Sequence, residues 1–361
     1  MPRTYRIAGI SFDHVHMPDL LRMVAATPNA EPVGVFDEDR SRMAAVAAEL
    51  SIPVDRIFTD FRECMETAKP DVAIICAATG RHGEWAERLT EYGAHLFVEK
   101  PFAAALDEAD RIIEAAESAG VRLMVNWPQR WNAVYVTAKR LVDAGLIGDV
   151  TEVHYYGGNR GPVTMVTDTA GMTDEQLLEA KRASWFYRRE SGGGSLLDYL
   201  GYGVTMGTWY MDGRKPVEVS CTVDVPEGID VDEQSVTICR YATGLSTFQT
   251  RWGTLTNPWE TQPQPKAGYT IVGRDGTLSA YSGDSVVRVQ TRQRPQIHEL
   301  QVEPLGFPER NPIEYLLDRL DTGQEIDGPV SPAISRVGQQ ITDSAILSAR
   351  EKRMVGLVGE V

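Results

Sequence analysis

Residues 94–101 read Ala-His-Leu-Phe-Val-Glu-Lys-Pro, an apolar run that ends in two charged residues and a proline. The run from Ala94 to Val98 is short and continuous, as is typical of a strand buried on both faces of a parallel sheet. Lys100 would then lie at the carboxyl edge of that sheet, where open α/β proteins bind ligands. Pro101 restricts the backbone and so limits the directions in which the Lys100 side chain can point. These features indicate a candidate acid/base lysine, although a solvated lysine is the alternative.

Short apolar runs alternate with helical periodicity over residues 1–126. We expect strands at residues 5–10, 31–36, 71–76, 94–98 and 121–125, and helices at residues 17–26, 40–50, 83–92 and 106–119. Strands that alternate with helices require right-handed crossovers and a parallel sheet. This part of the chain is therefore predicted to be a doubly wound α/β domain.

The pattern changes at Trp127. We expect helices at residues 133–144, 312–320 and 332–350, and strands at residues 150–156, 217–225, 235–241, 245–252, 269–273 and 286–290. Turn residues separate these strands, as in Arg274-Asp275-Gly276-Thr277. Residues 127–361 are therefore predicted to form a second α/β domain with an open, mostly antiparallel sheet.

Composition restricts the class of protein. The chain has 361 residues, 42% of them hydrophobic, and 36 basic against 51 acidic residues give a formal charge of -15. Such a charge repels nucleic acid and anionic membranes and favours small-molecule ligands. The four cysteines have no paired spacing, so we expect neither a disulfide framework nor a zinc site. With no signal sequence or transmembrane segment, we expect a soluble, cytoplasmic protein.

The turn after the first strand reads Gly9-Ile10-Ser11-Phe12-Asp13-His14. Only the first glycine of the dinucleotide fingerprint G-x-G-x-x-G is present, so this motif is weak, and a turn that binds nothing is the alternative. Asp37 follows the second strand directly, where an acid accepts hydrogen bonds from the adenosine ribose and repels a 2'-phosphate. NAD is therefore favoured over NADP, although Arg40 leaves binding of the 2'-phosphate of NADP as a minor alternative.

Five sequence pieces together resemble the Gfo/Idh/MocA family, named for glucose-fructose oxidoreductase, inositol dehydrogenase and a rhizopine catabolism protein. The pieces are the turn after the first strand, residues 78–82 (Ala-Thr-Gly-Arg-His), residues 99–101 (Glu-Lys-Pro), residues 129–131 (Gln-Arg-Trp) and residues 192–202 (Gly-Gly-Gly-Ser-Leu-Leu-Asp-Tyr-Leu-Gly-Tyr). The resemblance covers nearly the whole chain. It implies a Rossmann domain that binds NAD, and a carbohydrate that binds between the two domains.

The resemblance also implies the chemistry. Family members transfer a hydride between nicotinamide and a carbinol of a sugar or polyol, with the lysine that corresponds to Lys100 as acid/base. A lysine base must lose its proton near neutral pH, which the cationic nicotinamide and partial desolvation favour and Glu99 opposes. Two alternatives stay open: a redox-neutral NAD-dependent glycosidase that oxidises a ring carbon transiently, and a non-catalytic dinucleotide-binding regulator.

Asp198 and Tyr202 occupy positions where the family carries an Asp and, four residues later, usually a His. Spacing of i, i+4 puts both residues on one face of a helix. A phenol has a pKa near 10, so Tyr202 is less able than His to take a proton. We therefore expect Tyr202 to orient a hydroxyl or relay a proton, although a core aromatic residue is the alternative.

The remaining predicted site residues are of two kinds. For the cofactor, the resemblance implies contacts from Gly9, Ser11, Phe12, Asp37, Arg40, Ala77, Ala78, Thr79, His82, Glu99, Lys100 and Arg130. For the substrate we predict contacts from Lys100, Asn126, Trp127, Arg130, Trp185, Tyr187, Arg188, Asp198 and Tyr202. Aromatic faces stack on pyranose rings and arginines bind anions, so an anionic sugar, for example a sulfonated one, is one option.

Three histidines, His14, His16 and His82, gather near the cofactor turn in this interpretation, but their spacing matches no metal site. We therefore assign no metal. We expect a homodimer or homotetramer formed through the C-terminal sheet.

Overall fold

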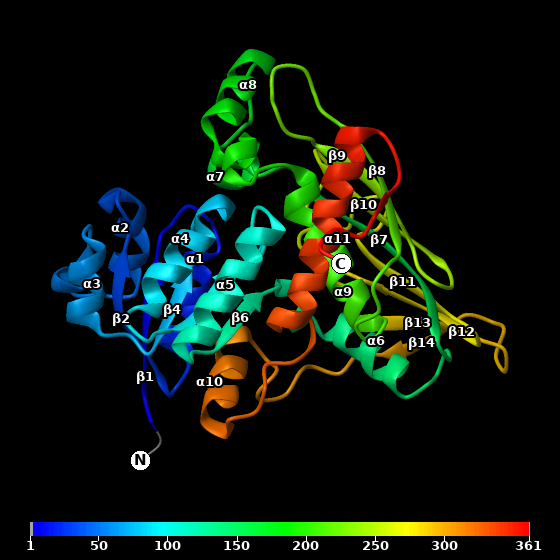
Figure 1. The fold of residues 1–361 in the computed structure, drawn as a ribbon, viewed down its shortest axis with the longest axis horizontal. Helices are drawn as coiled ribbons and strands as arrows, with labels where there is room; N and C mark the ends of the chain where they lie inside the picture. Colours follow the sequence, from blue (N-terminus) through cyan, green and yellow to red (C-terminus); the bar gives the residue numbers. More distant parts are fainter. Residues whose placement is uncertain (1–2, 361) are drawn as a thin grey trace. The chain divides into compact units, whose positions relative to one another are not determined.

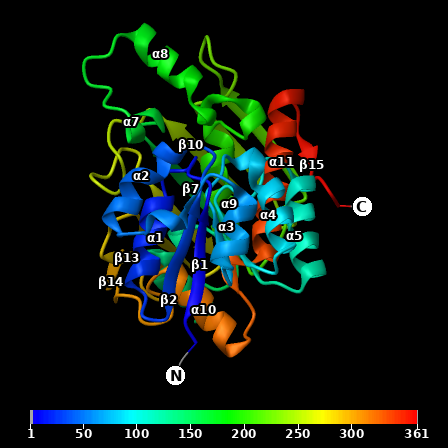
Figure 2. The ribbon, with the colours of Figure 1, turned by 90° about the vertical axis from the view of Figure 1, so that its left-hand side faces the viewer.

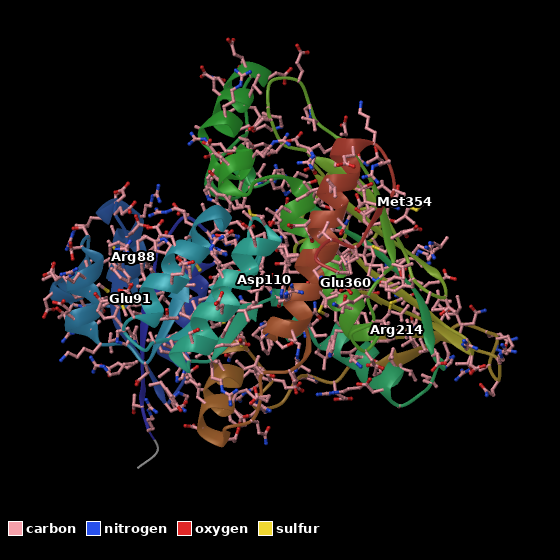
Figure 3. All side chains as sticks on the ribbon, in the orientation of Figure 1. Arg88, Glu91, Asp110, Arg214, Met354 and Glu360 are labelled. Carbon is pink, nitrogen blue, oxygen red and sulfur yellow. The ribbon has the colours of Figure 1, made fainter. Side chains whose placement is uncertain are left out.

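The computed structural model describes residues 3–360, which form two compact units. The first unit comprises residues 3–126 and Gly306–Pro332, and the second comprises Trp127–Leu305 and residues 333–360. No helix among the described residues is long and apolar enough to cross a membrane. Figure 3 shows charged side chains on the surface of each unit, among them Glu91 in the first and Glu360 in the second.

The first unit contains a six-stranded parallel sheet with the order β3-β2-β1-β4-β5-β6. Its strands are β1 (Tyr5–Ile10), β2 (Ala30–Phe36), β3 (Ile57–Phe58), β4 (Val72–Ile75), β5 (His95–Glu99) and β6 (Leu123–Asn126). This order is that of a Rossmann fold, with a topological switch between β1 and β4. The predicted doubly wound parallel sheet is confirmed (Figure 1).

Helices cover both faces of this sheet. They are α1 (Met17–Ala26), α2 (Arg40–Glu49), α3 (Phe61–Ala68), α4 (His82–Thr90), α5 (Leu106–Ala119) and α10 (Pro312–Thr322). Figure 2 shows α1 and α2 on one side of the strands and α3, α4 and α5 on the other. The sequence analysis missed β3 and α3, because a two-residue strand and an eight-residue helix give little periodicity.

Residues of β4 and the middle of β5 are fully buried, as the unbroken apolar runs of these strands require. Segment Gly306–Pro332 belongs to the first unit, whereas the sequence analysis placed it in the second domain. Its polar anchors lie in the first unit, because the Tyr5 hydroxyl donates to Asp321 at 2.8 Å and the Arg122 guanidinium donates to Glu325 at 2.6 Å.

The second unit contains a nine-stranded sheet with the order β14-β13-β12-β11-β7-β10-β9-β8-β15. Its strands are β7 (Val150–Asn159), β8 (Glu218–Asp224), β9 (Gln234–Arg240), β10 (Leu245–Trp252), β11 (Gly268–Gly273), β12 (Gly276–Tyr281), β13 (Val286–Thr291), β14 (His298–Gln301) and β15 (Val355–Gly356). Within residues 3–360, only β7 and β10 of this sheet pair in parallel, so the predicted mostly antiparallel sheet is confirmed.

The helices of the second unit are α6 (Ala133–Asp143), α7 (Val163–Val166), α8 (Asp174–Ala183), α9 (Gly201–Tyr210) and α11 (Pro332–Glu351). Glycines allow α9 to lie close to the sheet. A methyl group added at Gly203 would meet the Tyr155 ring at 2.4 Å, and one added at Gly207 would meet the Phe248 ring at 3.2 Å. Helix α9 carries Tyr202, so this contact fixes the height of that residue above the sheet.

Gly203→Ala should destabilise the second unit more than Gly207→Ala does. Both changes gain about 1 kcal/mol of helix propensity. At Gly203 the methyl group would overlap the buried Tyr155 ring, and overpacking of this kind costs about 1–3 kcal/mol. Urea unfolding of both variants measures the difference, and equal stability of the two would show that α9 can shift away from the sheet.

Candidate functional site

Lys100 follows β5 at the carboxyl edge of the first unit's sheet, as predicted, and its residue is only 6% exposed. Glu99, the last residue of β5, is fully buried. The Asn126 amide, at the end of neighbouring β6, donates to Glu99 Oε2 at 2.8 Å, and His16 Nδ1 lies 2.9 Å from Glu99 Oε1. Both carboxylate oxygens therefore have a fixed partner beside the lysine.

Charges at this edge influence one another. Burial alone would raise the pKa of Glu99, but the charge and hydrogen bond of His16, with the charge of Lys100, lower it below its usual value. Burial lowers the pKa of His14 well below its usual value, and the charge of Lys100 lowers it further. Glu99 is thus an anion and His14 a neutral imidazole near pH 7.

The turn after β1 departs from the glycine fingerprint without losing its shape. Ser11, at the second glycine position, has a φ of 63°, which is the left-handed conformation that a glycine would adopt easily. Gly9 has no room for a side chain, because a methyl group there would lie 2.9 Å from Met17 Sδ. The Phe12 amide donates to the Asp37 carboxylate at 2.7 Å, which ties the turn to the end of β2.

Asp13 is a member of this turn that the sequence analysis did not single out. Its carboxylate accepts hydrogen bonds from the Ser11 hydroxyl at 3.1 Å, from the Ala78 amide at 3.0 Å, and from the Arg42 guanidinium. Arg42 also lies 3.8 Å from Asp37, whereas Arg40 donates to the Ile57 carbonyl at 3.0 Å. The cation nearest to Asp37 is thus Arg42, and no local pattern in the sequence indicated it.

The segment after β4 is buried. Ala77, Ala78 and Thr79 are at most 7% exposed, and the Thr79 hydroxyl has no hydrogen-bond partner among the described residues. His82 Nε2 lies 3.1 Å from the Ala77 carbonyl, and its Nδ1 lies 3.2 Å from the Phe102 carbonyl. His82 therefore links this segment to the loop after Lys100, while the buried Thr79 hydroxyl suits a cofactor oxygen that would satisfy it.

In the second unit, Asp198 lies in a π-helical turn, Leu196–Leu200, that leads into α9. The sequence analysis expected Asp198 and Tyr202 on one face of a helix, and the π-helical turn was not expected. Gly192 and Gly194, with φ of 77° and 110°, allow the chain to enter this turn. Asp198 is 7% exposed and accepts a hydrogen bond from Trp252 Nε1 at 3.1 Å.

Asp232 anchors this turn, and sequence reasoning missed it. Its carboxylate accepts from the Ser195 hydroxyl at 2.7 Å and from the Leu196 amide at 2.8 Å. Burial raises the pKa of Asp232 to about 6, although these hydrogen bonds lower it. An acid 34 positions after Asp198, in a loop before β9, gives no sequence signal of this role.

Aromatic rings surround Tyr202. The residue is 7% exposed, and its ring lies edge to face with Trp127 at 5.4 Å between centroids. Trp127 is 2% exposed, donates from Nε1 to Ser335 at 3.0 Å, and closely approaches Gly201. Trp127, a predicted substrate contact, therefore packs beneath the helix that carries Tyr202. Arg130 is buried, with its guanidinium over the rings of Trp131 and Trp209.

The remaining predicted substrate residues lie in another part of the second unit. Tyr187 belongs to a buried cluster with Trp252, and Trp185 packs against that cluster. Because Trp252 also holds Asp198, these rings support the candidate acid. The Arg188 guanidinium donates to the carbonyls of residues 182 and 183, at the end of α8, so its contacts are those of a helix cap.

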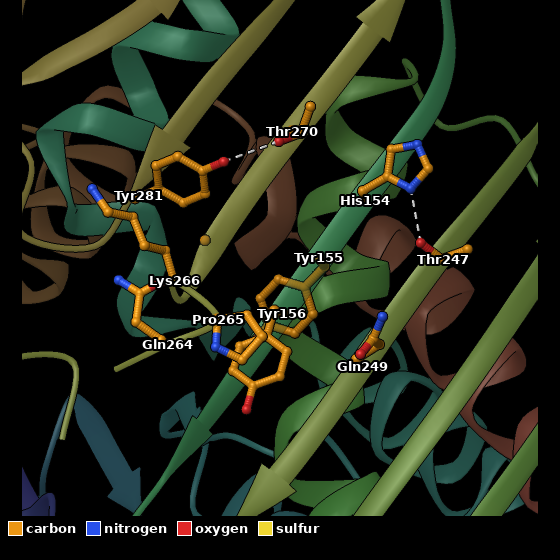
Figure 4. Close-up of a pocket in the computed structure, with 11 residues that line it drawn as sticks. His154, Tyr155, Tyr156, Thr247, Gln249, Gln264, Pro265, Lys266, Thr270 and Tyr281 are labelled. Carbon is orange, nitrogen blue, oxygen red and sulfur yellow. Dashed lines mark hydrogen bonds between the residues drawn. The ribbon is translucent and has the colours of Figure 1, made fainter. Parts of the chain in front are cut away.

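A pocket of about 520 Å³ lies on the sheet of the second unit and contains none of the predicted site residues. Polar and aromatic side chains line it, and Figure 4 shows His154 bonded to Thr247 and Tyr281 bonded to Thr270. Assembly through this sheet stays a prediction.

Comparison with known families follows the same division of the chain. A sequence model described as an oxidoreductase family with an NAD-binding Rossmann fold matches residues 6–127. A second model, described as the GFO/IDH/MocA C-terminal domain, matches residues 135–279. The chain belongs to the Gfo/Idh/MocA family. The predicted family and the predicted NAD-binding Rossmann fold are confirmed.

Similar curated proteins of this family include inositol dehydrogenases. The scyllo-inositol 2-dehydrogenase (NAD(+)) of Bacillus subtilis is 34% identical over 138 residues, which are 38% of this chain and 39% of that enzyme. Inositol 2-dehydrogenase of Rhizobium meliloti is 22% identical over 345 residues, which are 93% of this chain and 94% of that enzyme. The chain spans between 38% and 53% of the length of the first four curated relatives that it matches.

Solved structures share the fold. The aldose-aldose oxidoreductase from Caulobacter crescentus, crystallised with glycerol, has a TM-score of 0.78 and 17% identity, covering 99% of this chain and 100% of that chain. An oxidoreductase from Agrobacterium radiobacter, solved with NAD+, L-tartaric acid and magnesium, has a TM-score of 0.77 and 16% identity, covering 98% and 99%. At these identities the likeness concerns the fold alone.

The raised pKa of Asp232 predicts how stability changes with pH. The folded protein holds this proton up to about pH 6, whereas the ordinary value is 3.8, so the stability that the neutral carboxyl contributes is lost as pH rises between these values. Asp232→Asn stays neutral throughout. Its unfolding free energy, relative to the parent, should rise by up to about 3 kcal/mol across this range.

Urea unfolding at several pH values between 4 and 7 measures this difference. Asp149→Asn is the control, because the same change is made there on a side chain that is 81% exposed. Parallel curves for the parent and Asp232→Asn would contradict the assigned role of the buried carboxyl.

Proposed function

We propose that the protein is an NAD-dependent dehydrogenase that oxidises a ring CHOH group of a sugar, sugar derivative or cyclic polyol, with Lys100 as acid/base. The observation that carries the proposal is the place of Lys100: it is buried at the carboxyl edge of an NAD-binding Rossmann sheet. A base that takes a hydroxyl proton must be held within hydrogen-bond reach of that proton. The Glu99 carboxylate, held by Asn126 and His16, fixes the end of strand β5, from which Lys100 follows.

Residues of the first unit suit the dinucleotide. Gly9 lies close to Met17 of α1, beside the turn where the pyrophosphate would bind. Asp37, at the tip of β2, offers a ribose acceptor. The buried Thr79 hydroxyl, which has no hydrogen-bond partner among residues 3–360, offers a donor. NAD, when bound, supplies the hydride acceptor. Asp37 supports NAD over NADP, because a buried carboxylate repels a 2'-phosphate; the nearby Arg42 is already paired with Asp13.

The substrate class rests on relatives and on Asp198. Inositol 2-dehydrogenases from Bacillus subtilis and Rhizobium meliloti support a polyol or sugar carbinol. Asp198, held by Trp252, accepts hydrogen bonds and so suits a second hydroxyl of a polyol. We propose that Tyr202 orients the reacting hydroxyl, and that Lys100 takes its proton.

A substrate screen with NAD tests this function. Inositols, aldoses and glycosides would be scored both for NADH formation and for aglycone release. NADH formation with a free polyol or sugar supports the dehydrogenase. Aglycone release without net NADH would instead support the glycosidase alternative. If the protein binds NAD but gives neither signal, the result would support the non-catalytic dinucleotide-binding regulator.

Lys100→Met should abolish turnover and leave NAD affinity within about tenfold of the parent, because the lysine acts on the substrate proton. Steady-state kinetics and NAD titration by fluorescence measure the two effects. Lys69→Met is the matched control, since Lys69 lies exposed after α3 in the same unit. Normal turnover by Lys100→Met would remove the assignment.

Tyr202→Phe should reduce kcat by about ten- to a thousandfold, the range that a proton-transfer group contributes, with little change in melting temperature. Tyr199→Phe is the control, because Tyr199 is a neighbouring phenol whose ring lies 5.8 Å from that of Tyr202. Tyr202→His should retain part of the activity. A fully active Phe variant would show that the Tyr202 ring only packs against Trp127.

A further inference from the structure

His14, His16 and Glu99 converge at the carboxyl edge of the first unit's sheet. Each offers one ligand atom, and the three atoms lie within 4.8 Å of one another. The two histidines come from the turn between β1 and α1, and the acid ends β5. Because β4 pairs with both β1 and β5, the sheet brings together residues that are 83 positions apart. Their spacing in the sequence had indicated no metal site.

The distances suit a metal ion. Ligand atoms about 2.1 Å from a transition metal lie about 3 Å apart when they meet at a right angle. His16 Nδ1 and Glu99 Oε1 are already 2.9 Å apart. The His14 ring lies 4.4 Å from the His16 ring between centroids, and the His14 ligand atom lies within 4.8 Å of the other two, so His14 would complete the donor set by a rotation of its ring. That rotation would break a hydrogen bond of 3.2 Å from the His16 amide to His14 Nδ1.

We propose that His14, His16 and Glu99 bind a divalent first-row transition metal ion. Two imidazoles and one carboxylate are the donor set that such metals take while keeping coordination positions open. Burial keeps His14 and Glu99 in the wall of the site, whereas the His16 side chain is 32% exposed. The site therefore reaches solvent through the His16 side chain.

The surroundings of Glu99 support a ligand role. Asn126 donates to Glu99 Oε2, which leaves Oε1 aimed at the histidines, and metal ligands in proteins are commonly fixed by such outer hydrogen bonds. The nearby charge of Lys100 opposes a cation, so binding depends on the carboxylate. The existence of this site does not rest on the proposed function.

Metal binding to the full-length, tag-free protein tests the proposal. After removal of metals with a chelator, Co²⁺ titration followed by visible absorption should show one site per chain, and Zn²⁺ should displace the cobalt bands. His16→Ala and Glu99→Gln should each weaken Zn²⁺ binding by at least about 100-fold. Asn126→Ala should weaken it by about 10- to 100-fold, as loss of an outer hydrogen bond does.

His154→Ala is the matched control. His154 Nε2 lies 3.0 Å from Glu152 Oε2 in the second unit, so this pair resembles His16 and Glu99 but has no third ligand among the described residues. It should bind Zn²⁺ like the parent. Zn²⁺ affinity that is unchanged in His16→Ala, or that falls only in His154→Ala, overturns the proposal; so does a parent protein that binds no Co²⁺.

The variants also separate this site from the proposed function. His16→Ala removes a partly exposed side chain that is also the partner of Glu99 Oε1, and Glu99→Gln removes the buried charge, so thermal melting monitors the folding of both variants. Lys100→Met should retain the metal site. Stoichiometric cobalt without dehydrogenase activity would refute the proposed function alone, and activity in a protein that binds no cobalt would refute the metal site alone.

Discussion

The buried carboxylate of Glu99 is the constraint on which the rest of the candidate site depends. A fully buried anion is costly unless each oxygen has a partner, and here the two partners come from different elements, Asn126 of β6 and His16 of the β1–α1 turn. One charge thus holds three elements together. Lys100 is the next residue, so the hydrogen bonds of Glu99 also fix the backbone position of the lysine. An exposed acid at this position would make no such demand.

The same device recurs wherever the chain must hold a functional segment. Glu108 accepts the amides of Gly83 and Ala104, so it ties α4 to the loop after Lys100. Asp37 accepts the Phe12 amide, and Asp232 accepts the Leu196 amide. Each carboxylate satisfies backbone donors that a buried loop would otherwise leave unpaired, at positions where regular secondary structure cannot supply acceptors. These acids therefore tie the loops to neighbouring elements through backbone amides.

The sequence predicted the strands with long apolar runs, because burial on both faces requires such runs, and it predicted the place of Lys100 for the same reason. It could not predict Asp232 or Asp13, whose partners are set by tertiary contacts. The π-helical turn at Asp198 was equally hidden, since its residues are as compatible with an α-helix. Trp127 stays a predicted sugar contact, and the packing of its indole against Gly201 is a tertiary contact that no local pattern indicated.

Ser11 and His14 stand where the dinucleotide fingerprint has its second and third glycines, and each makes a contact that a glycine could not make. Ser11 replaces one and donates to Asp13, which also accepts the Ala78 amide and pairs with Arg42; His14 replaces the other and approaches His16. A glycine at either place would give the backbone freedom but no donor or ligand. The substitutions therefore exchange a turn that binds phosphate through bare amides for one that carries side chains of its own, at the cost of a left-handed serine. The positions that depart from the fingerprint therefore bring functional side chains to this turn. Asp13 pairs with Arg42 there, and two imidazoles, those of His14 and His16, lie beside Glu99.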